Sequence, residues 1–524
     1  MRLTQTKLIL CTSIFFVLFD NFAFFQHVMQ IYPVTLKNIG FLASLAVGLT
    51  SLMVLLLTLL SSKYTTKPVL ILLLMLSSFA AYFMNHYNVV IDHTMIQNII
   101  KTNMNEALDL FSVKLLYYSF FLGLIPSLLV YRIKPEPMPW KKATLTKARD
   151  ILISILVIIA MLLLFSRFYT SFFREHKPLR YYTNPSYYMY SIGKYIGKTF
   201  GNTKVTVRPI GLDAKKSLDD SARKLVILVV GEAVREDRLS LNGYPRETTP
   251  LLQKENVISF TNMYSCGTTT AHSVPCMFSI LPRAEYSEAK GNAVENLPDV
   301  LGHAGVHLLW RDNNSDSRDT ARKIPYQDYS NPKINTVCDG ECRDEGMLVG
   351  LQDYIDGKPG GDILVVLHQM GNHGPAYYKR YPAAFEKFTP VCRTNQFDEC
   401  TQEEIGNAYD NALLYTDYFL TQVIGLLKKN TPGFETAMLY VSDHGESLGE
   451  YNIYLHGLPY AMAPDSQKHI ACLFWFGDRF KIDKQSLKNK ASEPFSHDNL
   501  FHTVLGLMKV ETSIYDKGLD ILAE

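Results

Sequence analysis

The sequence predicts a helical domain that crosses a membrane five times, followed by an α/β domain with a mostly parallel sheet in three layers. Three observations support this fold class. Long apolar runs dominate the first third of the 524 residues. In the remainder, short continuous runs rich in β-branched residues alternate with helical stretches, which is typical of buried parallel strands. Polar clusters follow these runs directly, as they do at the ligand-binding edge of open α/β sheets.

Five apolar runs are long enough, or nearly so, to cross a bilayer, which takes about 20 residues in a helix. Asp20 and Asn21 interrupt the first run, and we expect them to face other helices rather than lipid. A cleaved signal peptide is the alternative for that run, but no small-residue cleavage site follows it. The five runs are 8–28, 40–60, 69–86, 114–131 and 150–168.

Basic residues concentrate on one side of these predicted spans, which favours the cytoplasm for that side and for the N-terminus. The loops on the other side carry Lys37, Lys101 and Lys114. Five crossings then place everything after residue 168 outside the cytoplasm. The basic residues of the cytoplasmic segments are Arg2, Lys7, Lys63, Lys67, Arg132, Lys134, Lys141, Lys142, Lys147 and Arg149.

Composition divides the chain into a membrane domain (1–168, with an outer loop at 87–113), a connector (169–222) and a second domain (223–524). The connector mixes aromatic with basic residues, which suits the headgroup layer of a membrane. A linker packed on the second domain is the alternative. The formal net charge of +2 argues against a nucleic-acid partner, which favours a strongly basic domain.

Six of the eight cysteines stand in close pairs in the part predicted to lie outside the cytoplasm, where short-range pairs indicate disulfides. A zinc knuckle is the alternative for Cys338 and Cys342, but no second ligand pair lies nearby. Cys11 and Cys472 are expected to be buried thiols. The pairs are Cys266/Cys276, Cys338/Cys342 and Cys392/Cys400.

Carboxylates and imidazoles follow several of the predicted strands, and together they are suitable ligands for a divalent metal. Any one of them alone is more often a surface residue or a helix cap, but clusters at successive strand ends favour a metal site. They follow the runs 225–230, 306–310, 363–367 and 437–441. The candidate ligands are Glu232, His368, His373, Asp443 and His444.

The candidate nucleophile is Thr270, the last of three threonines between Cys266 and Cys276. A disulfide between these cysteines would hold the hydroxyl in place beside a metal. A threonine alcohol is a poor nucleophile at neutral pH, but a divalent cation stabilises its alkoxide. A stapled, threonine-rich turn without any chemistry is the alternative on the residues alone.

Four motifs give the chain a close resemblance, over essentially its whole length, to the lipid A phosphoethanolamine transferases. This family includes the transferable colistin-resistance enzymes and belongs to the alkaline phosphatase superfamily. The motifs are Cys-Gly-Thr-x-Thr-Ala-x-Ser-Val-Pro-Cys-Met-Phe-Ser at 266–279, His-Gln-Met-Gly-Asn-His-Gly-Pro at 368–375, Ser-Asp-His-Gly-Glu-Ser-Leu-Gly-Glu at 442–450 and Leu-His-Gly at 455–457.

The resemblance implies an alkaline-phosphatase-like periplasmic domain with one tight zinc site, and it assigns residues to roles. Thr270 would be both nucleophile and zinc ligand. His373 and His456 would contact the phosphoryl group, or a second zinc ion, and help to protonate the leaving alcohol. The zinc ligands would be Glu232, Thr270, Asp443 and His444, and the substrate-binding residues Asn98, Thr102, Glu106, Asn314 and Arg318.

The substrate-binding residues include a set with helical spacing and a residue that differs from the one usual in the family. Asn98, Thr102 and Glu106 stand at i, i+4 and i+8, on one face of a predicted helix. The resemblance implies that this face approaches the ethanolamine head, and a solvated polar face is the alternative. Arg318 stands where the colistin-resistance relatives usually have lysine, and arginine keeps the charge but not the geometry.

The implied reaction moves phosphoethanolamine from phosphatidylethanolamine to a phosphate of lipid A through a phospho-threonine. The protein would act as a monomer in the bacterial inner membrane and lower sensitivity to polymyxins. A lipopolysaccharide core sugar or another envelope glycan is the alternative acceptor. A sulfatase is disfavoured because Met277, Phe278 and Ser279 after Cys276 do not fit the formylglycine motif. A catalytically silent lipid sensor is disfavoured because Thr270 and its expected partners are intact.

Overall fold

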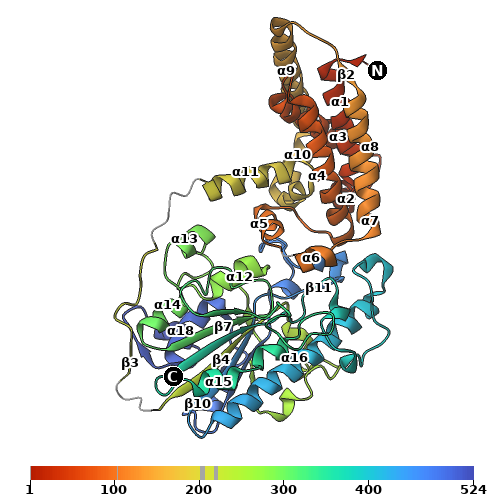
Figure 1. Ribbon diagram of the computed structural model, residues 1–524. Helices are drawn as coiled ribbons and strands as arrows, with labels where there is room; N and C mark the ends of the chain where they lie inside the picture. The colour runs from red at the N-terminus through yellow and green to blue at the C-terminus, as the bar shows by residue number, and fades with distance from the viewer. Residues whose placement is uncertain (1, 103, 201–206, 218–221, 524) are drawn as a thin grey trace. The chain divides into compact units, whose positions relative to one another are not determined.

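The computed structural model describes residues 2–102, 104–200, 207–217 and 222–523, and the chain forms two compact units. One unit comprises residues 1–97 and 111–197, and the other comprises residues 98–110 and 198–524. Figure 1 shows that the first is helical and that the second is built around a sheet. The middle of loop 87–113, residues 98–110, therefore groups with the second unit, and the first part of connector 169–222 groups with the first.

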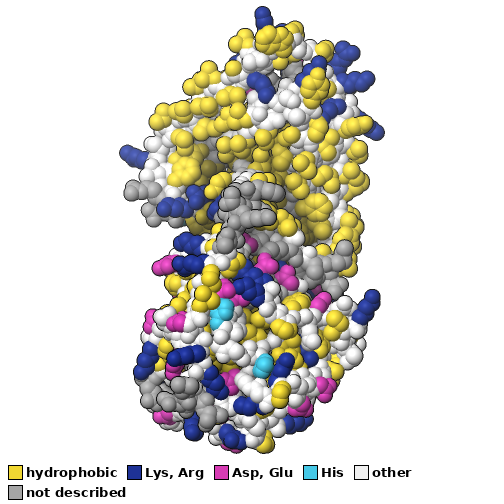
Figure 2. All heavy atoms as spheres, turned by 60° about the vertical axis from the view of Figure 1, so that its left-hand side comes forward, with side chains coloured by type: hydrophobic (Ala, Val, Ile, Leu, Met, Phe, Trp, Pro, Cys, Tyr) yellow, Lys and Arg dark blue, Asp and Glu magenta, His cyan; other side chains and the backbone are white. Residues whose placement is uncertain are grey.

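Within the residues that the structure describes, the helical unit contains three helices that are long and apolar enough to cross a membrane, and two bent helix pairs that pass the same test as pairs. The five predicted spans are present if each bent pair forms one span. Figure 2 shows hydrophobic side chains over much of the surface of this unit. The candidates are Ile39–Leu60 (α3), Thr66–Tyr87 (α4), Val113–Arg132, Gln5–Asp20 with Phe22–Ile31, and Trp140–Leu164 with Ser166–Phe173.

Three of these five candidates are made of more than one helix. The span at 113–132 consists of two α-helices joined by a π-helical stretch at Ser119–Leu124. The remaining helices are α1 (Gln5–Phe15), α2 (Phe22–Ile31), α5 (His93–Lys101), α7 (Val113–Tyr118), α8 (Ile125–Arg132), α9 (Trp140–Leu164), α10 (Ser166–Glu175) and α11 (Ser186–Phe200).

The first helix pair bends by 60° at Asn21, the position where the sequence places polar residues inside an apolar run. The Asn21 amide donates to the Phe16 carbonyl oxygen at 2.9 Å, and its own oxygen accepts the Asn184 backbone N–H at 2.9 Å. The Asn184 amide donates to the Asp20 and Ser77 carbonyl oxygens at 3.1 and 2.9 Å. Because side-chain amides satisfy the backbone at the break, the helix can bend inside the bundle.

The two free cysteines differ from one another. Cys472 is buried in a strand, which confirms the prediction for this residue. The prediction for Cys11 was wrong, because its side chain is exposed on the surface of α1. An apolar run identifies a span but does not show which side of the helix faces its neighbours.

A seven-stranded sheet forms the centre of the second unit. The five strands from β10 to β8 run parallel, and β13 and β5 add an antiparallel edge. The four predicted strand runs are the four adjacent strands β10, β4, β9 and β7. In order across the sheet the strands are β5 (Ile258–Ser259), β13 (Cys472–Phe476), β10 (Glu435–Ser442), β4 (Lys224–Gly231), β9 (Ile363–His368), β7 (His307–Asp312) and β8 (Tyr326–Asp328).

Helices cover both faces of this sheet (Figure 1), which makes the three predicted layers. Helix α16 (Gln402–Asn430) packs against β10 and β4. On the opposite face, helices α12 (Thr270–Met277), α14 (Leu297–His303) and α18 (Leu500–Leu507) contribute to one hydrophobic core with alternate residues of the strands. The central strands are buried throughout, as their uninterrupted apolar sequences predict.

All three predicted cysteine pairs form disulfides, Cys266–Cys276, Cys338–Cys342 and Cys392–Cys400. The zinc knuckle considered for the second pair is therefore not needed. The first disulfide connects the loop before α12 to the last turn of that helix. The remaining elements named below are α6 (Met104–Asp109), β11 (Ser447–Leu448) and β12 (Tyr454–Leu455).

Candidate active site

The candidate site lies where four parallel strands end side by side. Ser442 at the end of β10 pairs with Gly231 at the end of β4, and Val230 pairs with His368 at the end of β9. His368 pairs in turn with Asp312 at the end of β7. The residues that follow these ends come together at one edge of the sheet, as the sequence predicts.

Thr270 is the first residue of α12, and its hydroxyl reaches this edge. Thr270 Oγ1 donates to Glu232 Oε2 at 3.0 Å and lies 3.3 Å from His444 Nε2. Of its two neighbours, Thr268 donates instead to the Leu458 carbonyl oxygen at 2.7 Å. The hydroxyl of Thr269 has no hydrogen-bond partner in the described part of the chain. Thr270 is therefore the threonine of the run that faces acidic and imidazole groups.

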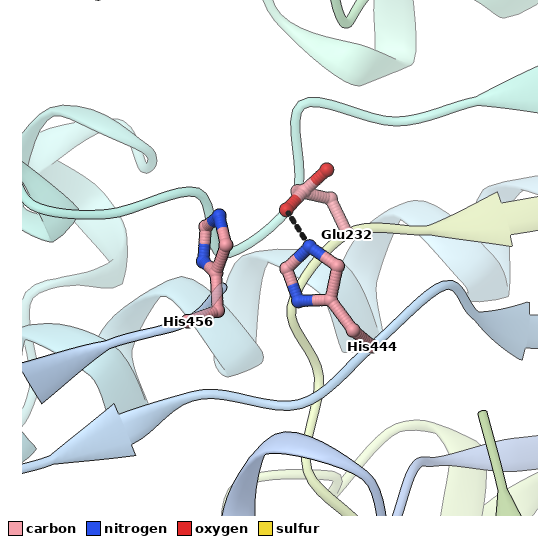
Figure 3. A group of neighbouring side chains, drawn as sticks. All are labelled: Glu232, His444 and His456. Carbon is pink, nitrogen blue, oxygen red and sulfur yellow. Dashed lines mark ion pairs between the residues drawn. The ribbon is translucent and has the colours of Figure 1, made fainter. Parts of the chain in front are cut away.

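His444 stands between the two carboxylates of the cluster. Its Nε2 lies 3.4 Å from Glu232 Oε1 and 3.4 Å from Asp443 Oδ2. The other ring nitrogen, Nδ1, is 2.8 Å from the Gly445 carbonyl oxygen. A carbonyl oxygen can only accept, so Nδ1 carries the proton and the lone pair of Nε2 points at the carboxylates. Figure 3 shows His444 facing Glu232, with the ring of His456 beside it.

Burial makes this cluster of charges unstable on its own. Glu232, Asp443 and His444 have no exposed side-chain surface. Burial, followed by the nearby Asp443 charge, raises the pKa of Glu232 well above its ordinary value, and burial lowers the pKa of His444. Glu232 Oε1 and Asp443 Oδ2 have no hydrogen-bond partner among the described residues. Two buried oxygens of this kind beside an imidazole lone pair fit a divalent cation, which would neutralise both carboxylates.

His456 belongs to the same cluster, although it follows no strand of the main sheet. It directly follows β12, which pairs with β11 in a small hairpin beyond the end of β10. One ligand atom each from Glu232, His444 and His456 lies within 4.8 Å of the other two. His456 Nδ1 is 2.8 Å from Glu446 Oε2, which fixes the orientation of the ring. These three residues form a candidate metal site.

His373 lies beside His456, with 5.9 Å between the ring centroids, but outside that three-residue group. Burial, reinforced by the Arg380 charge, lowers the pKa of His373 well below its ordinary value. Its Nδ1 has no hydrogen-bond partner in the described ranges. His373 therefore offers a neutral imidazole next to the cluster.

His368, a candidate ligand on its strand-end position, instead forms a buried pair with a carboxylate. Its Nδ1 is 2.9 Å from Asp312 Oδ2, which also accepts the Trp310 indole N–H at 2.8 Å. Burial alone would lower the pKa of His368, but the Asp312 charge outweighs it and raises the pKa. His368 is not part of the group of three ligand atoms.

Asn314 and Arg318 lie on the loop after β7. The Asn314 amide donates to Glu232 Oε2 at 2.8 Å and to the Gln369 carbonyl oxygen at 2.9 Å, so it holds the carboxylate that Thr270 contacts. Arg318 has a φ of 50°, and its guanidinium is 3.3 Å from Asp316 Oδ1 at Nε. Arg318 Nη1 has no hydrogen-bond partner among the described residues, so this buried cation still has a donor to offer.

The residues predicted to share one helical face in loop 87–113 do not stand on one helix, because Asn98 lies in α5, Thr102 follows the end of α5, and Glu106 lies in α6. Helix α5 ends at Lys101, and α6 begins at Met104. The Thr102 hydroxyl donates to the Asn98 carbonyl oxygen at 2.8 Å, so it closes the end of α5. The side chain of Glu106 lies outside the described residues.

Two buried residues of the site were not singled out from the sequence. Glu446 accepts the Tyr377 hydroxyl at 2.7 Å in addition to its contact with His456. His497 Nδ1 accepts the Cys266 backbone N–H at 3.1 Å, and its Nε2 donates to the Ser442 carbonyl oxygen at 2.9 Å. Glu446 stands within the 442–450 motif and could have been found there, whereas His497 carries no local signal.

Comparisons with known proteins identify both units. Residues 224–510 match the sulfatase family, and residues 49–200 match the family described as phosphoethanolamine transferase EptA/EptB. The phosphatidylethanolamine transferase Mcr-2 of Escherichia coli is 43% identical over 511 residues, which cover 95% of this chain and 94% of that protein.

Solved structures show the same similarity. The integral membrane lipooligosaccharide phosphoethanolamine transferase A (EptA) from Neisseria meningitidis has a TM-score of 0.95 and 35% identity, covering 100% of this chain and 99% of that chain. The C-terminal periplasmic domain of EcEptC from Escherichia coli, in complex with Zn, has a TM-score of 0.51 and 22% identity, over 61% of this chain and 90% of that one. At this low identity the second similarity supports the fold alone.

Proposed function

This chain belongs to the lipid A phosphoethanolamine transferases of the sulfatase and alkaline phosphatase superfamily, and we propose that Thr270 carries the phosphoethanolamine group in transit. The protein is an integral membrane enzyme with a periplasmic catalytic domain, and it transfers phosphoethanolamine to lipid A. The single observation that supports the role of Thr270 is its hydroxyl, 3.0 Å from Glu232 Oε2 and 3.3 Å from His444 Nε2.

The first half-reaction places phosphoethanolamine on Thr270. Thr270 Oγ1 attacks the phosphorus of phosphatidylethanolamine, its proton passes to Glu232 Oε2, and the bond from phosphorus to the diacylglycerol oxygen breaks. Thr270 Oγ1 already donates to Glu232 Oε2 at 3.0 Å, so this carboxylate oxygen is placed to take up the proton. A proton donor is needed for the departing alkoxide, and His373 and His456 are the imidazoles beside the cluster.

The second half-reaction restores the enzyme. A phosphate oxygen of lipid A attacks the phosphorus on Thr270, the bond from phosphorus to Oγ1 breaks, and the threonine regains its proton. Arg318 has an unpartnered Nη1 among the described residues, and we assign it and Asn314 to the substrate pocket, where cationic and amide donors stabilise charge on the phosphoryl oxygens. Asn98, Thr102 and Glu106 are assigned to the ethanolamine head of the donor.

Zinc fits the cluster, and Glu232, Thr270, Asp443 and His444 would hold it. Carboxylate and imidazole ligands of this kind are typical zinc donors. When bound, zinc supplies a positive charge that favours the deprotonated threonine, as it lowers the pKa of bound water from about 16 to about 7. His456 is either a further ligand or, together with His373, a contact of the phosphoryl group or of a second zinc ion.

The consequence for the cell follows from charge. A phosphate of lipid A capped with ethanolamine carries less net negative charge, so cationic peptides such as polymyxins bind the surface less strongly. We expect a polymyxin-sensitive host that makes this protein to become less sensitive. Unchanged sensitivity, with modified lipid A present, would separate the enzymatic activity from the resistance.

Mass spectrometry tests the proposal directly. Full-length protein in vesicles that contain phosphatidylethanolamine and lipid A should add phosphoethanolamine to lipid A, and a peptide containing Thr270 should carry the same mass increment. The Thr270→Ala variant should lose both products, whereas Thr270→Ser keeps a hydroxyl and should retain part of the activity. Lipid A modification by the alanine variant at the wild-type rate would refute a phospho-threonine intermediate.

A further inference from the structure

Among the described residues, the buried carboxylate of Asp109, at the end of α6, joins segment 98–110 to the catalytic domain. Asp109 Oδ1 lies 2.5 Å from Lys379 Nζ, and Oδ2 lies 2.7 Å from Arg380 Nη2. The side-chain amide of Asn395 also donates to the backbone carbonyl oxygen of Asp109. The Asp109 side chain is 10% exposed and that of Arg380 is 3% exposed, so water screens this pair little.

Arg380 is a shared anchor, because its guanidinium contacts three separate segments. Nη2 contacts Asp109, Nη1 lies 2.5 Å from Glu341 Oε1, and Nε donates to the His373 carbonyl oxygen at 2.7 Å. A planar guanidinium offers donors in fixed directions, so it holds its partners in a defined arrangement. The same group thus fixes both the end of segment 98–110 and the backbone of His373.

The charges around Arg380 make each contact dependent on the others. Burial alone would raise the pKa of Asp109, but the Arg380 and Lys379 charges outweigh it and lower the pKa, so Asp109 is ionised at neutral pH. Removal of one partner from a buried ion pair leaves the other charge uncompensated, which costs more than the net worth of the pair. Loss of the Asp109 charge should therefore release α6 from the catalytic domain.

We propose that Asp109 is a positioning residue that aligns segment 98–110, which carries the residues assigned to the ethanolamine head, with the catalytic site, and that Arg380 anchors both this segment and His373. The proposal rests on the function proposed above. It concerns residues that touch neither the phosphoryl group nor the metal cluster. Their effect is on the position of segment 98–110 and of His373, which are assigned to contact the substrate.

The proposal predicts different results for two donors. The Asp109→Asn variant frees the segment but leaves Arg380 bound to Glu341 and to the His373 carbonyl. It should raise KM for phosphatidylethanolamine in vesicles by roughly tenfold or more, with a smaller change in kcat. With a water-soluble ethyl phosphodiester of a chromogenic alcohol, which lacks the ammonium group that segment 98–110 is assigned to bind, the burst of released alcohol should stay within about twofold of wild type. The Arg380→Gln variant should slow both reactions, because it also frees His373.

Glu341→Gln is the matched control, since it removes the other carboxylate of Arg380 and leaves segment 98–110 in place. It should keep the wild-type KM for the lipid donor. Equal losses in Asp109→Asn and Glu341→Gln would overturn the proposal, because Asp109 would then act only by neutralising Arg380. Asp109→Glu, which keeps the charge, should recover part of the lipid activity.

Hydrogen exchange of the full-length protein tests the contact without any turnover. Amides of residues 104–109 should exchange faster by roughly tenfold or more in Asp109→Asn and at the wild-type rate in Glu341→Gln. Unchanged exchange in Asp109→Asn would overturn the proposal, whatever the activity. Faster exchange, together with a wild-type protein that shows no burst with the soluble diester, would point to a failure of the proposed chemistry and not of the contact.

Discussion

Asp20 in the helical unit and Asp443 in the catalytic unit are both buried carboxylates with unpartnered oxygens in the described part of the chain. Their surroundings differ. Asp443 Oδ2 lies 3.4 Å from His444 Nε2, which also lies 3.4 Å from Glu232 Oε1. Around Asp20 the hydrogen bonds given by Asn21 and Asn184 go to backbone carbonyl oxygens, including that of Asp20 itself.

The comparison shows that burial and unpartnered oxygens do not by themselves identify a functional carboxylate. A cation site needs a second negative group and a lone pair aimed at the same point, and Asp443 has both. Asp20 lies where a helix bends, and the amides beside it serve the broken backbone. Substitutions at Asp443 and Asp20 should therefore differ in effect, because Asp443 is expected to bind a cation and Asp20 is expected only to fill space at the helix bend.

The largest effect is expected for Asp443→Asn. The amide keeps the size of the side chain but cannot balance a divalent cation, so zinc binding and alkoxide formation should both fail. Phosphoethanolamine transfer to lipid A should fall by at least about 10²- to 10³-fold, the range found when a charge-stabilising group is lost. Transfer is followed by mass spectrometry and bound zinc by elemental analysis of the purified protein. Full zinc occupancy in this variant would remove Asp443 from the ligand set.

Removal of the metal should produce a smaller effect on stability, confined to the catalytic unit. A ligand that binds only the folded state at 100 times its Kd stabilises it by about 2.7 kcal/mol. Treatment with a chelator should therefore lower the thermal unfolding midpoint of the catalytic domain by several degrees, and zinc should restore it. Asp443→Asn should show no such response, whereas Asp20→Asn should respond as wild type does. A zinc response in Asp443→Asn would contradict the proposed ligand set.

The ends of the strands could be predicted because their continuous apolar runs stop sharply at Gly231, His368 and Ser442. His456 was assigned to the site through the resemblance to the family alone, because its position depends on a hairpin that folds back beyond β10. Contacts between distant segments, such as that of His497 with Cys266, leave no periodic or local pattern in the sequence.

The helical unit shows the same limit. Hydropathy located the spans, but it did not give the 60° bend at Asn21, which depends on hydrogen bonds from Asn184. The spacing of Asn98, Thr102 and Glu106 indicated one helix, whereas α5 ends at Lys101. Spacing describes a residue's place within a helix but not whether the helix continues.

His497 provides a third case, a buried polar residue with partners on both nitrogens, and its effect should depend on pH. Burial lowers the pKa of His497 to about 4, because the charged imidazolium would lose its hydration in the interior. An unfolded histidine titrates near 6.5, so the unfolded state binds a proton first as the pH falls. The stability of the catalytic domain should be unaffected by this group above pH 6.5 and should fall by about 3 kcal/mol between pH 6.5 and 4.

Denaturant unfolding of the catalytic domain at several pH values measures this dependence. The His497→Gln variant should lose the pH dependence of the unfolding free energy that this histidine contributes between pH 6.5 and 4. It should also be less stable than wild type at pH 7. An identical pH dependence in wild type and variant would mean that His497 is not the group that titrates.

The smallest effect is expected for Asp20→Asn, which separates the two buried carboxylates most clearly. An ionised carboxylate without a partner is costly inside a membrane, and asparagine has nearly the same shape without the charge. The variant should transfer phosphoethanolamine at a rate within about twofold of wild type and unfold at the same or a slightly higher temperature. Asn184→Ala is the control, since it removes the amide that donates to the Asp20 and Ser77 carbonyl oxygens, and it should destabilise the bundle by roughly 1–3 kcal/mol. If Asp20→Asn abolished transfer while the protein stayed folded, the carboxylate itself would have a function in the membrane, and burial with unpartnered oxygens would mark a functional group in both units.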